Sequence, residues 1–404
     1  MARVRKRSWL TETGEKKSAW AVDWSDHANT RHRKQFSIKR DADAFRVEIE
    51  GQLRTGLFRP EAAKITVAEA ATEFYGHCHA RMARGERMTR ATLLYYKGHI
   101  DNYIIGARGP VGKLPPFEGG IGHLKLVHLT TRAVSDFRDR LRDAGRSVML
   151  TRKVIGSLHC IMEFAKSQDY IAANPAAGIR VIGRRNEGAK RVVPPSKELV
   201  AALLRLAGAT LRLRIVVAAA AGPRAGELHA LRWRHVNFDS ERLRIETRVD
   251  AWGNEDGQGT KTASGNREVP LAHMVVAQLR EWRLRSRFSA EDDLIFPNAR
   301  GKYTRHGNMV KRRFKPLLKQ LAELHKSNPG EWPEPENFTW RGFRHFAISC
   351  WIEAGLSLKT VQTFAGHASS QITMDRYGHL FPSDDHSTAM NTIGRSIFMP
   401  QPEK

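Results

Sequence analysis

Residues 340–380 of the chain read WRGFRHFAISCWIEAGLSLKTVQTFAGHASSQITMDRYGHL. Arg341 and Arg344 stand three residues apart in this stretch, so on a helix their side chains would lie one turn apart. His367 follows a glycine at a predicted helix end, and Tyr377 comes ten residues later. Each residue alone is a weak indication of function, because a lone histidine or tyrosine more often packs in a core than takes part in catalysis.

Two earlier stretches contain similar polar residues. AAGPRAGELHALRW, residues 220–233, places Arg224 and Glu227 three apart, so on a helix the carboxylate can orient the guanidinium. Taken alone, this is an ordinary surface ion pair. GTKTASGNREVPL, residues 259–271, places Lys261 among small and polar residues before a strand-like segment. That pattern predicts a lysine at the tip of a hairpin, which is also common on inert surfaces.

In this order and spacing, the stretches resemble the tyrosine recombinase family. The family has an arginine with a nearby glutamate, a hairpin lysine, a His-x-x-Arg box, a Gly-His box and then a tyrosine. AGPRAGELHALRW resembles the first-arginine box, TKT the lysine hairpin, RGFRH the second-arginine box, FAGH the Gly-His box and MDRYGHL the nucleophile box. The resemblance implies a site-specific DNA recombinase, the integrase of a phage or other mobile element, which works through a 3′-phosphotyrosine intermediate.

The resemblance implies a role for each matching residue. Tyr377 would be the nucleophile, and Arg224 and Arg344 would clamp the non-bridging oxygens of a doubly charged transition state. Glu227 would hold Arg224 in place. Bond energy is kept in the phosphotyrosine and the arginines supply the positive charge, so neither ATP, another cofactor nor a metal is expected. A phenol with an ordinary pKa near about 10 is a poor nucleophile until its oxygen is aimed and its anion stabilised.

The remaining roles concern proton transfer. Lys261 could protonate the departing 5′-oxygen if nearby cations lower its pKa, and His367 would add a hydrogen bond to the phosphate. The first residue of the His-x-x-Arg box is Arg341, which has no hydrogen-bond acceptor and stays protonated. It is expected to contact the phosphate, with no acid or base role. His345 could approach the site but is expected to pack or to cap its helix, so the acceptor of the tyrosine proton stays open.

The first part of the chain has its own pattern. Apolar and basic residues alternate in residues 1–60, which predicts short strands with one apolar face: Trp20, Val22 and Trp24, then Phe36 and Ile38. Asp41 is expected to cap a helix with apolar residues every fourth position, at Phe45, Ile49 and Leu53. A sheet with a basic exposed face can lie in a DNA groove. A solvated basic face on a minor domain is the alternative.

Residues 61–180 are predicted to be helical. One helix would bury a face made of Val67, Ala71, Phe74, Tyr75 and Cys78. Another would begin at a cap on Thr130 or Thr131, and Asn174-Pro175 is expected to end the last helix. From Ser196 onward the pattern predicts helices, a strand-like section from about Leu243 to Leu271, and helices again.

The predicted fold class is a multidomain chain, mainly α with small β elements. Residues 1–60 resemble the arm-binding domain of phage-type integrases, and residues 61–180 resemble the helical core-binding domain of the family. An Arg- and Lys-rich linker over 181–195 would lead to a mixed, mainly α catalytic domain over 196–390. Residues 391–404 would form a tail that either packs against a neighbouring protomer or frays.

Charge points to a polyanionic partner. The chain of 404 residues has 67 Lys and Arg against 42 Asp and Glu, a formal net charge of +25. Binding of such a chain to double-stranded DNA releases counterions from the phosphates, although ribosomes or acidic membranes would attract it too. No long apolar run or signal-peptide segment is evident, and three scattered cysteines indicate reduced thiols, so a cytoplasmic protein is expected.

Several alternatives remain. A type IB topoisomerase uses similar chemistry without two specific sites, a binding-only protein could keep the fold without cleavage, and a basic architectural protein would share the charge. His77, Cys78 and His79 could suggest a metal site, but helical neighbours do not face one ion. Recombination of two duplexes implies a tetramer on DNA attachment sites. The target sequences, the direction of recombination and any DNA-bending protein or directionality factor stay open.

Overall fold

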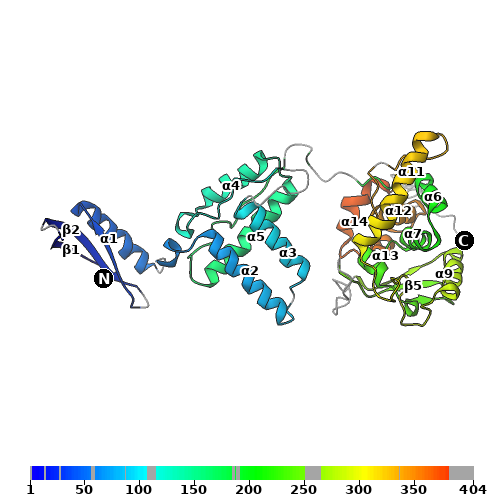
Figure 1. Ribbon diagram of the computed structural model, residues 1–404, viewed down its shortest axis with the longest axis horizontal. Coiled ribbons are helices and arrows are strands. Elements are labelled where there is room, and N and C mark those ends of the chain that lie inside the picture. The colour runs from blue at the N-terminus through cyan, green and yellow to red at the C-terminus, as the bar shows by residue number, and fades with distance from the viewer. Residues whose placement is uncertain are drawn as a thin grey trace, which may run out of the picture. The chain divides into compact units, whose positions relative to one another are not determined.

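The computed structural model describes residues 2–12, 15–26, 29–55, 60–86, 88–106, 115–183, 187, 192–250, 265–335 and 337–381. The chain forms two compact units, Met1–Gly188 and Ala189–Lys404 (Figure 1). Within the described ranges, no helix is long and apolar enough to cross a membrane. Lys261, the tail over 391–404, and residues 184–186 and 188–191 of the expected linker lie outside the described residues.

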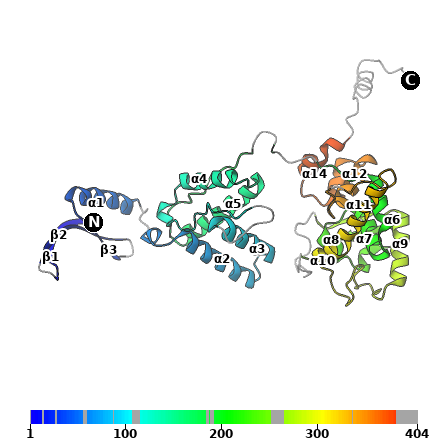
Figure 2. The same ribbon diagram turned by 45° about the horizontal axis from the view of Figure 1, so that its top comes forward.

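The first unit begins with a three-stranded antiparallel sheet in the order β1-β2-β3, made of β1 (Arg3–Leu10), β2 (Lys16–Ser25) and β3 (Arg31–Phe36). Helix α1 (Lys39–Arg54) covers one face of it (Figure 2). Val22 and Trp24 are buried against this helix, which confirms the predicted alternation, whereas β1 was not expected. The expected cap at Asp41 is wrong, because α1 begins two residues earlier and Asp41 lies in its first turn.

The rest of the first unit is helical. Its main helices are α2 (Val67–Ala83), α3 (Arg90–His99), α4 (Thr131–Asp143) and α5 (Val148–Ser167). Short turns and a π-helix join them: Pro60–Ala63, Ile100–Ile104 and Leu126–His128. Thr130 caps α4, as expected. The expected end of the last helix at Asn174 is wrong: α5 ends at Ser167, and the Asn174 amide instead donates hydrogen bonds back to α5, to Glu163 over 2.7 Å and the His159 carbonyl over 3.1 Å.

The second unit packs its helices around a small antiparallel sheet. The sheet has the order β4-β5-β6, with β4 (Val236–Asn237), β5 (Arg242–Ile245) and β6 (Arg267–Pro270). Pairing of β5 with β6 confirms strands at the two ends of the expected strand-like section, of which residues 251–264 lie outside the described residues. The helices are α6 (Lys197–Leu206), α7 (Ala209–Ala221), α8 (Ala225–Ala230), α9 (His273–Arg285), α10 (His306–Met309), α11 (Lys315–Ser327), α12 (Gly342–Glu353), α13 (Leu358–Ala365) and α14 (Ser370–Tyr377). Short helical turns cover Trp233–His235, Val310–Phe314 and Gly378–Leu380.

Two apolar clusters hold the second unit together. The larger one includes Trp233, Phe314 and Phe343 and joins α7 to α12. The smaller one gathers Ile348, Val361 and Tyr377 from α12, α13 and α14. This buried packing fixes the helices that carry the predicted site residues to one another.

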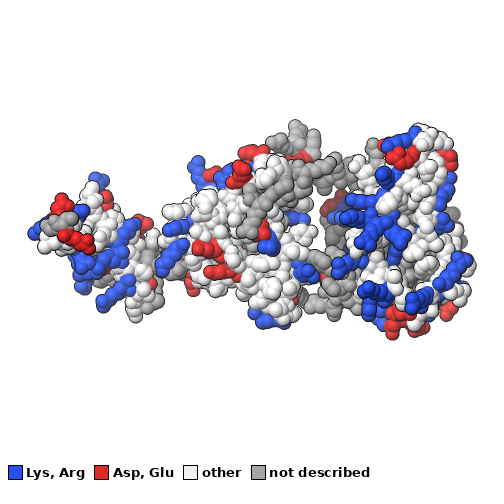
Figure 3. All heavy atoms as spheres, viewed as in Figure 1, with Lys and Arg blue, Asp and Glu red and all other residues white. Residues whose placement is uncertain are grey.

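Lys and Arg side chains form a patch on the face of this unit drawn in Figure 3, with few acidic side chains among them.

Candidate active site

Arg224 and Glu227 meet at the turn between α7 and α8. Gly222 ends α7 in the left-handed region, with φ of 57°, and Arg224 then precedes the first residue of α8. Glu227 Oε2 accepts a hydrogen bond from the Arg224 backbone N–H over 2.8 Å, and Glu227 Oε1 accepts one from Arg224 Nη1 over 2.7 Å. The expected contact is present, although Arg224 lies just before the helix rather than within it. Glu227 is buried and Arg224 is partly exposed, so the carboxylate aims the guanidinium outward.

Arg344 projects from α12 beneath this pair. Its Nη1 donates to the Gly222 carbonyl over 2.7 Å, and its Nη2 donates to the Ala365 carbonyl. Burial and the neighbouring charge of Arg224 lower the pKa of Arg344 to about 9. The guanidinium therefore stays mainly protonated at neutral pH, in a position fixed by two backbone oxygens.

Arg267 is a third arginine in this cluster, and the sequence pattern assigned it no role. From β6, its Nη2 donates to Glu227 Oε2 over 2.8 Å and its Nε donates to the Phe364 carbonyl over 2.7 Å. Burial would raise the pKa of Glu227, but the charges and hydrogen bonds of Arg267 and Arg224 outweigh it and lower the pKa to about 2. Glu227 is therefore a buried carboxylate held between two arginines.

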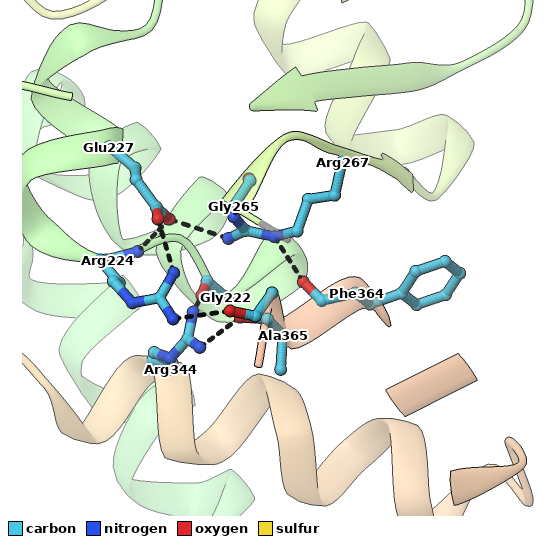
Figure 4. Close-up of polar contacts among 9 residues, drawn as sticks. Gly222, Arg224, Glu227, Gly265, Arg267, Arg344, Phe364 and Ala365 are labelled. Atoms are coloured by element: carbon cyan, nitrogen blue, oxygen red, sulfur yellow. Dashed lines mark hydrogen bonds and ion pairs between the residues drawn. The ribbon is translucent and has the colours of Figure 1, made fainter. Parts of the chain in front are cut away.

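The C-terminal end of α13 joins the three arginines. Its consecutive carbonyls at positions 364, 365 and 366 accept hydrogen bonds from Arg267, Arg344 and Arg224 respectively (Figure 4). The carbonyls at a helix C-terminus have no partners within the helix and carry partial negative charge. Together with the Glu227 carboxylate, these three carbonyls can therefore stabilise three positively charged arginines that lie close to one another.

Tyr377 closes α14, and its side chain lies between two histidines. Its hydroxyl is 2.6 Å from His345 Nδ1, and its ring stacks on that of His367, with 6.4 Å between centroids and 16° between planes. Burial raises the pKa of Tyr377, partly offset by the charges of Arg344, Arg376 and Arg341. The phenol is therefore neutral at physiological pH and its oxygen is held in a fixed direction.

His367 is fixed by a neighbour on α14. Its Nδ1 lies 2.9 Å from the hydroxyl of Thr373, which is fully buried. Burial, followed by the charges of Arg344 and Arg224, lowers the pKa of His367 to about 3. The imidazole is therefore neutral near pH 7, and its Nε2 side remains for other contacts. Gly366, which precedes it, ends α13 in the left-handed region as expected, with φ of 61°.

The structure brings together Arg224, Glu227, Arg344, His367 and Tyr377. Arg341 lies exposed at the start of α12, where its charge acts on Tyr377 and His345.

Sequence reasoning missed Arg267 and Thr373. It expected His345 to pack or to cap a helix and left an approach to the site open; the ring does approach the site, with Nδ1 2.6 Å from the Tyr377 hydroxyl. The available signal for Arg267 was its position two residues before Val269 in a predicted strand, which places the arginine on the same face as an apolar residue. Among the described residues, no group of three or more His, Cys, Asp or Glu side chains could hold a metal ion.

Known proteins share this architecture. Residues 195–383 match the model of the Phage integrase family. A tyrosine recombinase XerC-like protein of Caldanaerobacter subterraneus is 23% identical over 390 residues, 89% of this chain and 91% of that protein. The ICEBs1 integrase of Bacillus subtilis is 24% identical over 270 residues, 65% of this chain and 70% of that protein. The Tn1549 transposon integrase, solved with a circular intermediate DNA, shares the fold with a TM-score of 0.60 and 17% identity, over 82% of this chain and 99% of that chain. The chain belongs to the tyrosine recombinase and phage integrase family.

Proposed function

We propose that this protein is a site-specific recombinase of a mobile element that cleaves and rejoins DNA through a 3′-phosphotyrosine at Tyr377. One observation supports this most directly: the Tyr377 phenol is aimed by a hydrogen bond beside Arg344, Arg224 and His367. Binding DNA alone would not require a buried, oriented phenol next to arginines held in a fixed cluster.

The reaction follows from these groups. The Tyr377 oxygen attacks the scissile phosphorus, a new P–O bond forms, and the bond to the 5′-oxygen breaks. Arg224 and Arg344 stabilise the charge on the non-bridging oxygens, and His367 donates a further hydrogen bond. Lys261 protonates the departing 5′-oxygen. Rejoining is the reverse attack by a 5′-hydroxyl, which releases the tyrosine and needs no external energy source.

Arg341 would add a further contact to the phosphate. It is exposed at the start of α12, and its charge reaches Tyr377. An arginine donates hydrogen bonds to a phosphate without changing its protonation state. Its role is therefore electrostatic, and it leaves proton transfer to other groups.

The rest of the chain would bind the DNA partners. The outer face of the N-terminal sheet places Arg5 and Arg33 on either side of Asp23, with ion pairs of 2.6 and 2.5 Å. We assign this sheet, residues 1–60, to accessory DNA, and the helices of 61–180 together with the domain of 196–390 to the site of exchange. Exchange between two duplexes requires four strand cuts, and hence four protomers.

The association with a mobile element rests on the relatives. The ICEBs1 integrase of Bacillus subtilis and the Tn1549 transposon integrase are integrases by name. The sheet at the start of the chain (β1, β2 and β3) fits an enzyme that contacts DNA beyond its cleavage site. We therefore propose that the enzyme acts on double-stranded attachment sites of a phage or another mobile element.

A covalent adduct tests this function. The recognised DNA is first selected from random-sequence duplexes with the Tyr377→Phe variant, and a nicked suicide substrate is then built on it. The wild type is expected to form an adduct that survives denaturing electrophoresis, and Tyr377→Phe to bind without forming one. Tyr95→Phe, at an exposed tyrosine of α3, is the matched control. Binding without any wild-type adduct would leave a binding-only protein, and relaxation of plasmids that lack the site would indicate a topoisomerase.

A further inference from the structure

The tyrosine proton has a specific acceptor within reach. Nδ1 of His345 lies 2.6 Å from the Tyr377 hydroxyl oxygen, close enough for a hydrogen bond between these atoms. His345 follows Arg344 on α12, so the same helix carries a phosphate-clamping arginine and a ring that faces the nucleophile. This contact involves the reacting atom itself, which distinguishes His345 from residues that only support the site.

The surroundings keep His345 neutral in the protein without DNA. Burial, followed by the positive charges of Arg341, Arg344 and Arg376, lowers the pKa of His345 to about 4. Arg344 lies on α12, Arg341 lies directly before its first residue, and Arg376 lies on α14. Tyr377 is the other titratable group that contacts the ring. A neutral imidazole has one ring nitrogen with a lone pair. At Nδ1 that lone pair can accept the phenolic hydrogen.

The other nearby groups are less suited to accept this proton. The guanidinium of Arg341 has no acceptor atom. The ring of His367 stacks on the Tyr377 ring, and its Nδ1 is engaged by the Thr373 hydroxyl over 2.9 Å. Among the described residues, His345 is thus the group whose geometry fits proton transfer from Tyr377.

We propose that His345 is the catalytic base of cleavage and the acid of rejoining, a role that rests on the proposed recombinase function. As the Tyr377 oxygen bonds to phosphorus, its proton moves to His345 Nδ1. The electron pair of the breaking bond leaves with the 5′-oxygen, which takes a proton from Lys261. In rejoining, the attacking 5′-hydroxyl gives its proton back to Lys261, the bond from phosphorus to the Tyr377 oxygen breaks, and the imidazolium returns its proton to the departing phenolate.

DNA binding would strengthen this base. The scissile phosphate brings negative charge among Arg224, Arg344 and Arg341, and so offsets the positive charges that disfavour an imidazolium at His345. The protein without DNA therefore holds a weak base against a neutral phenol. A bound phosphate would therefore make His345 a stronger base, which ties activation of the nucleophile to the presence of its target.

Substitution of His345 by asparagine tests the proposal. The Asn oxygen can take the place of Nδ1 and accept the same hydrogen bond, but it cannot take up the proton. On the nicked substrate, His345→Asn is expected to bind DNA as the wild type does and to form adduct about 100-fold more slowly. His273→Asn, at an exposed histidine of α9, is the matched control. Adduct formation by His345→Asn at the wild-type rate would overturn the proposal.

A substrate with a different leaving group distinguishes a base that acts on Tyr377 from an acid that acts on the 5′-oxygen. A substrate with sulfur in place of the bridging 5′-oxygen releases a thiolate, which needs no proton from the enzyme. The defect of His345→Asn is expected to persist on this substrate, whereas that of Lys261→Ala is expected to disappear. If sulfur restores His345→Asn to the wild-type rate, His345 protonates the leaving group and the proposal is wrong. Absence of a wild-type adduct on either substrate would instead reject the recombinase function.

A second measurement leaves His345 unchanged, in case the variant does not fold. Difluorotyrosine incorporated at position 377 has a more acidic phenol than tyrosine. Because His345 takes the proton during attack, the rise of the cleavage rate with pH follows the loss of a proton from His345, and its midpoint is expected to be the same for difluorotyrosine and tyrosine. A midpoint that moves to lower pH with the more acidic phenol would show that Tyr377 loses its proton before the attack and would overturn the proposal.

Discussion

Arg267 and Glu227 form an ion pair of 2.8 Å inside the second unit, with side chains only 1% and 4% exposed. The second oxygen of the same carboxylate holds Arg224. The pair thus connects β6, the strand that follows the Lys261 segment, to an arginine of the proposed phosphate clamp. A shift of β6 is therefore expected to displace Arg224 as well, because both arginines are bound to this one carboxylate.

Loss of Arg267 is therefore expected to affect both folding and cleavage. Arg267→Met removes one partner of a buried carboxylate and should destabilise the protein by about 3–5 kcal/mol. Urea denaturation measures this loss, and Arg242→Met, at an exposed arginine of β5, is the control. The double variant Arg267→Met/Glu227→Gln should recover part of the stability, because the carboxylate charge that lost its Arg267 partner is also removed. Equal stability of Arg267→Met and the control would show that the ion pair has no net effect.

Thr373 is expected to act on the reaction through His367. Thr373→Val keeps the shape of this buried side chain but removes the hydroxyl 2.9 Å from His367 Nδ1. Loss of one hydrogen bond should cost about 1 kcal/mol of stability. The misdirected ring should slow adduct formation about tenfold, the factor for 1.4 kcal/mol of transition-state stabilisation. Thr373→Ser retains the hydroxyl and should behave as the wild type; equal rates for Val and Ser would contradict this role.

Arg341 is expected to tune the histidine next to the nucleophile. Its charge is the next cause after burial that lowers the pKa of His345. Arg341→Gln should therefore raise the pKa of His345 in the protein without DNA. Titration of labelled histidine ring carbons by NMR measures the change, with the His345 signal assigned from His345→Asn. A pKa that does not change between wild type and Arg341→Gln would mean that solvent screens the two side chains from each other.

Buried histidines make the second unit sensitive to acid. Burial lowers the pKa of both His229 and His367 to about 3. In the unfolded chain a histidine takes up its proton near about pH 6.5. Stability is thus complete above that pH and is lost as the pH falls from about 6.5 toward 3, by up to about 1.4 kcal/mol per pH unit for each histidine.

Urea denaturation at about pH 7 and about pH 5 measures this dependence. His229→Gln should reduce the loss of stability between the two pH values, because the variant lacks one histidine that takes up a proton only when the chain unfolds. The exposed His273→Gln should leave it unchanged. If the wild type is equally stable at both pH values, the buried histidines are protonated without cost and the explanation is wrong.

The sequence predicts the family well because the motif residues lie in fixed local patterns. Arg224 and Glu227 are three residues apart and meet as expected, and Gly366 ends α13. The alternation of Val22 and Trp24 likewise predicts a one-sided sheet. These features depend on neighbours along the chain, which a single sequence displays.

Features that depend on distant segments could not be predicted. Arg267 meets Glu227 across 40 positions and the end of α13 across 97. Its other partners, the backbone carbonyls of Phe364 and Gly265, leave no trace in residue identity. His345 follows Arg344, so helical spacing alone turns it to a different side of α12, and only the packing of α14 brings Tyr377 to it.

The three carbonyls at the end of α13 make the proposed clamp a product of the finished fold. Arg224, Arg267 and Arg344 come from separate segments and share no acidic partner other than Glu227 within the described residues. Without α13, the three positive charges would lack the carbonyls at positions 364, 365 and 366. A nascent or damaged chain would thus have its tyrosine but no means to cut. Assembly of the proposed clamp would thus depend on a docked α13, which ties the ability to cleave DNA to completed folding of the second unit.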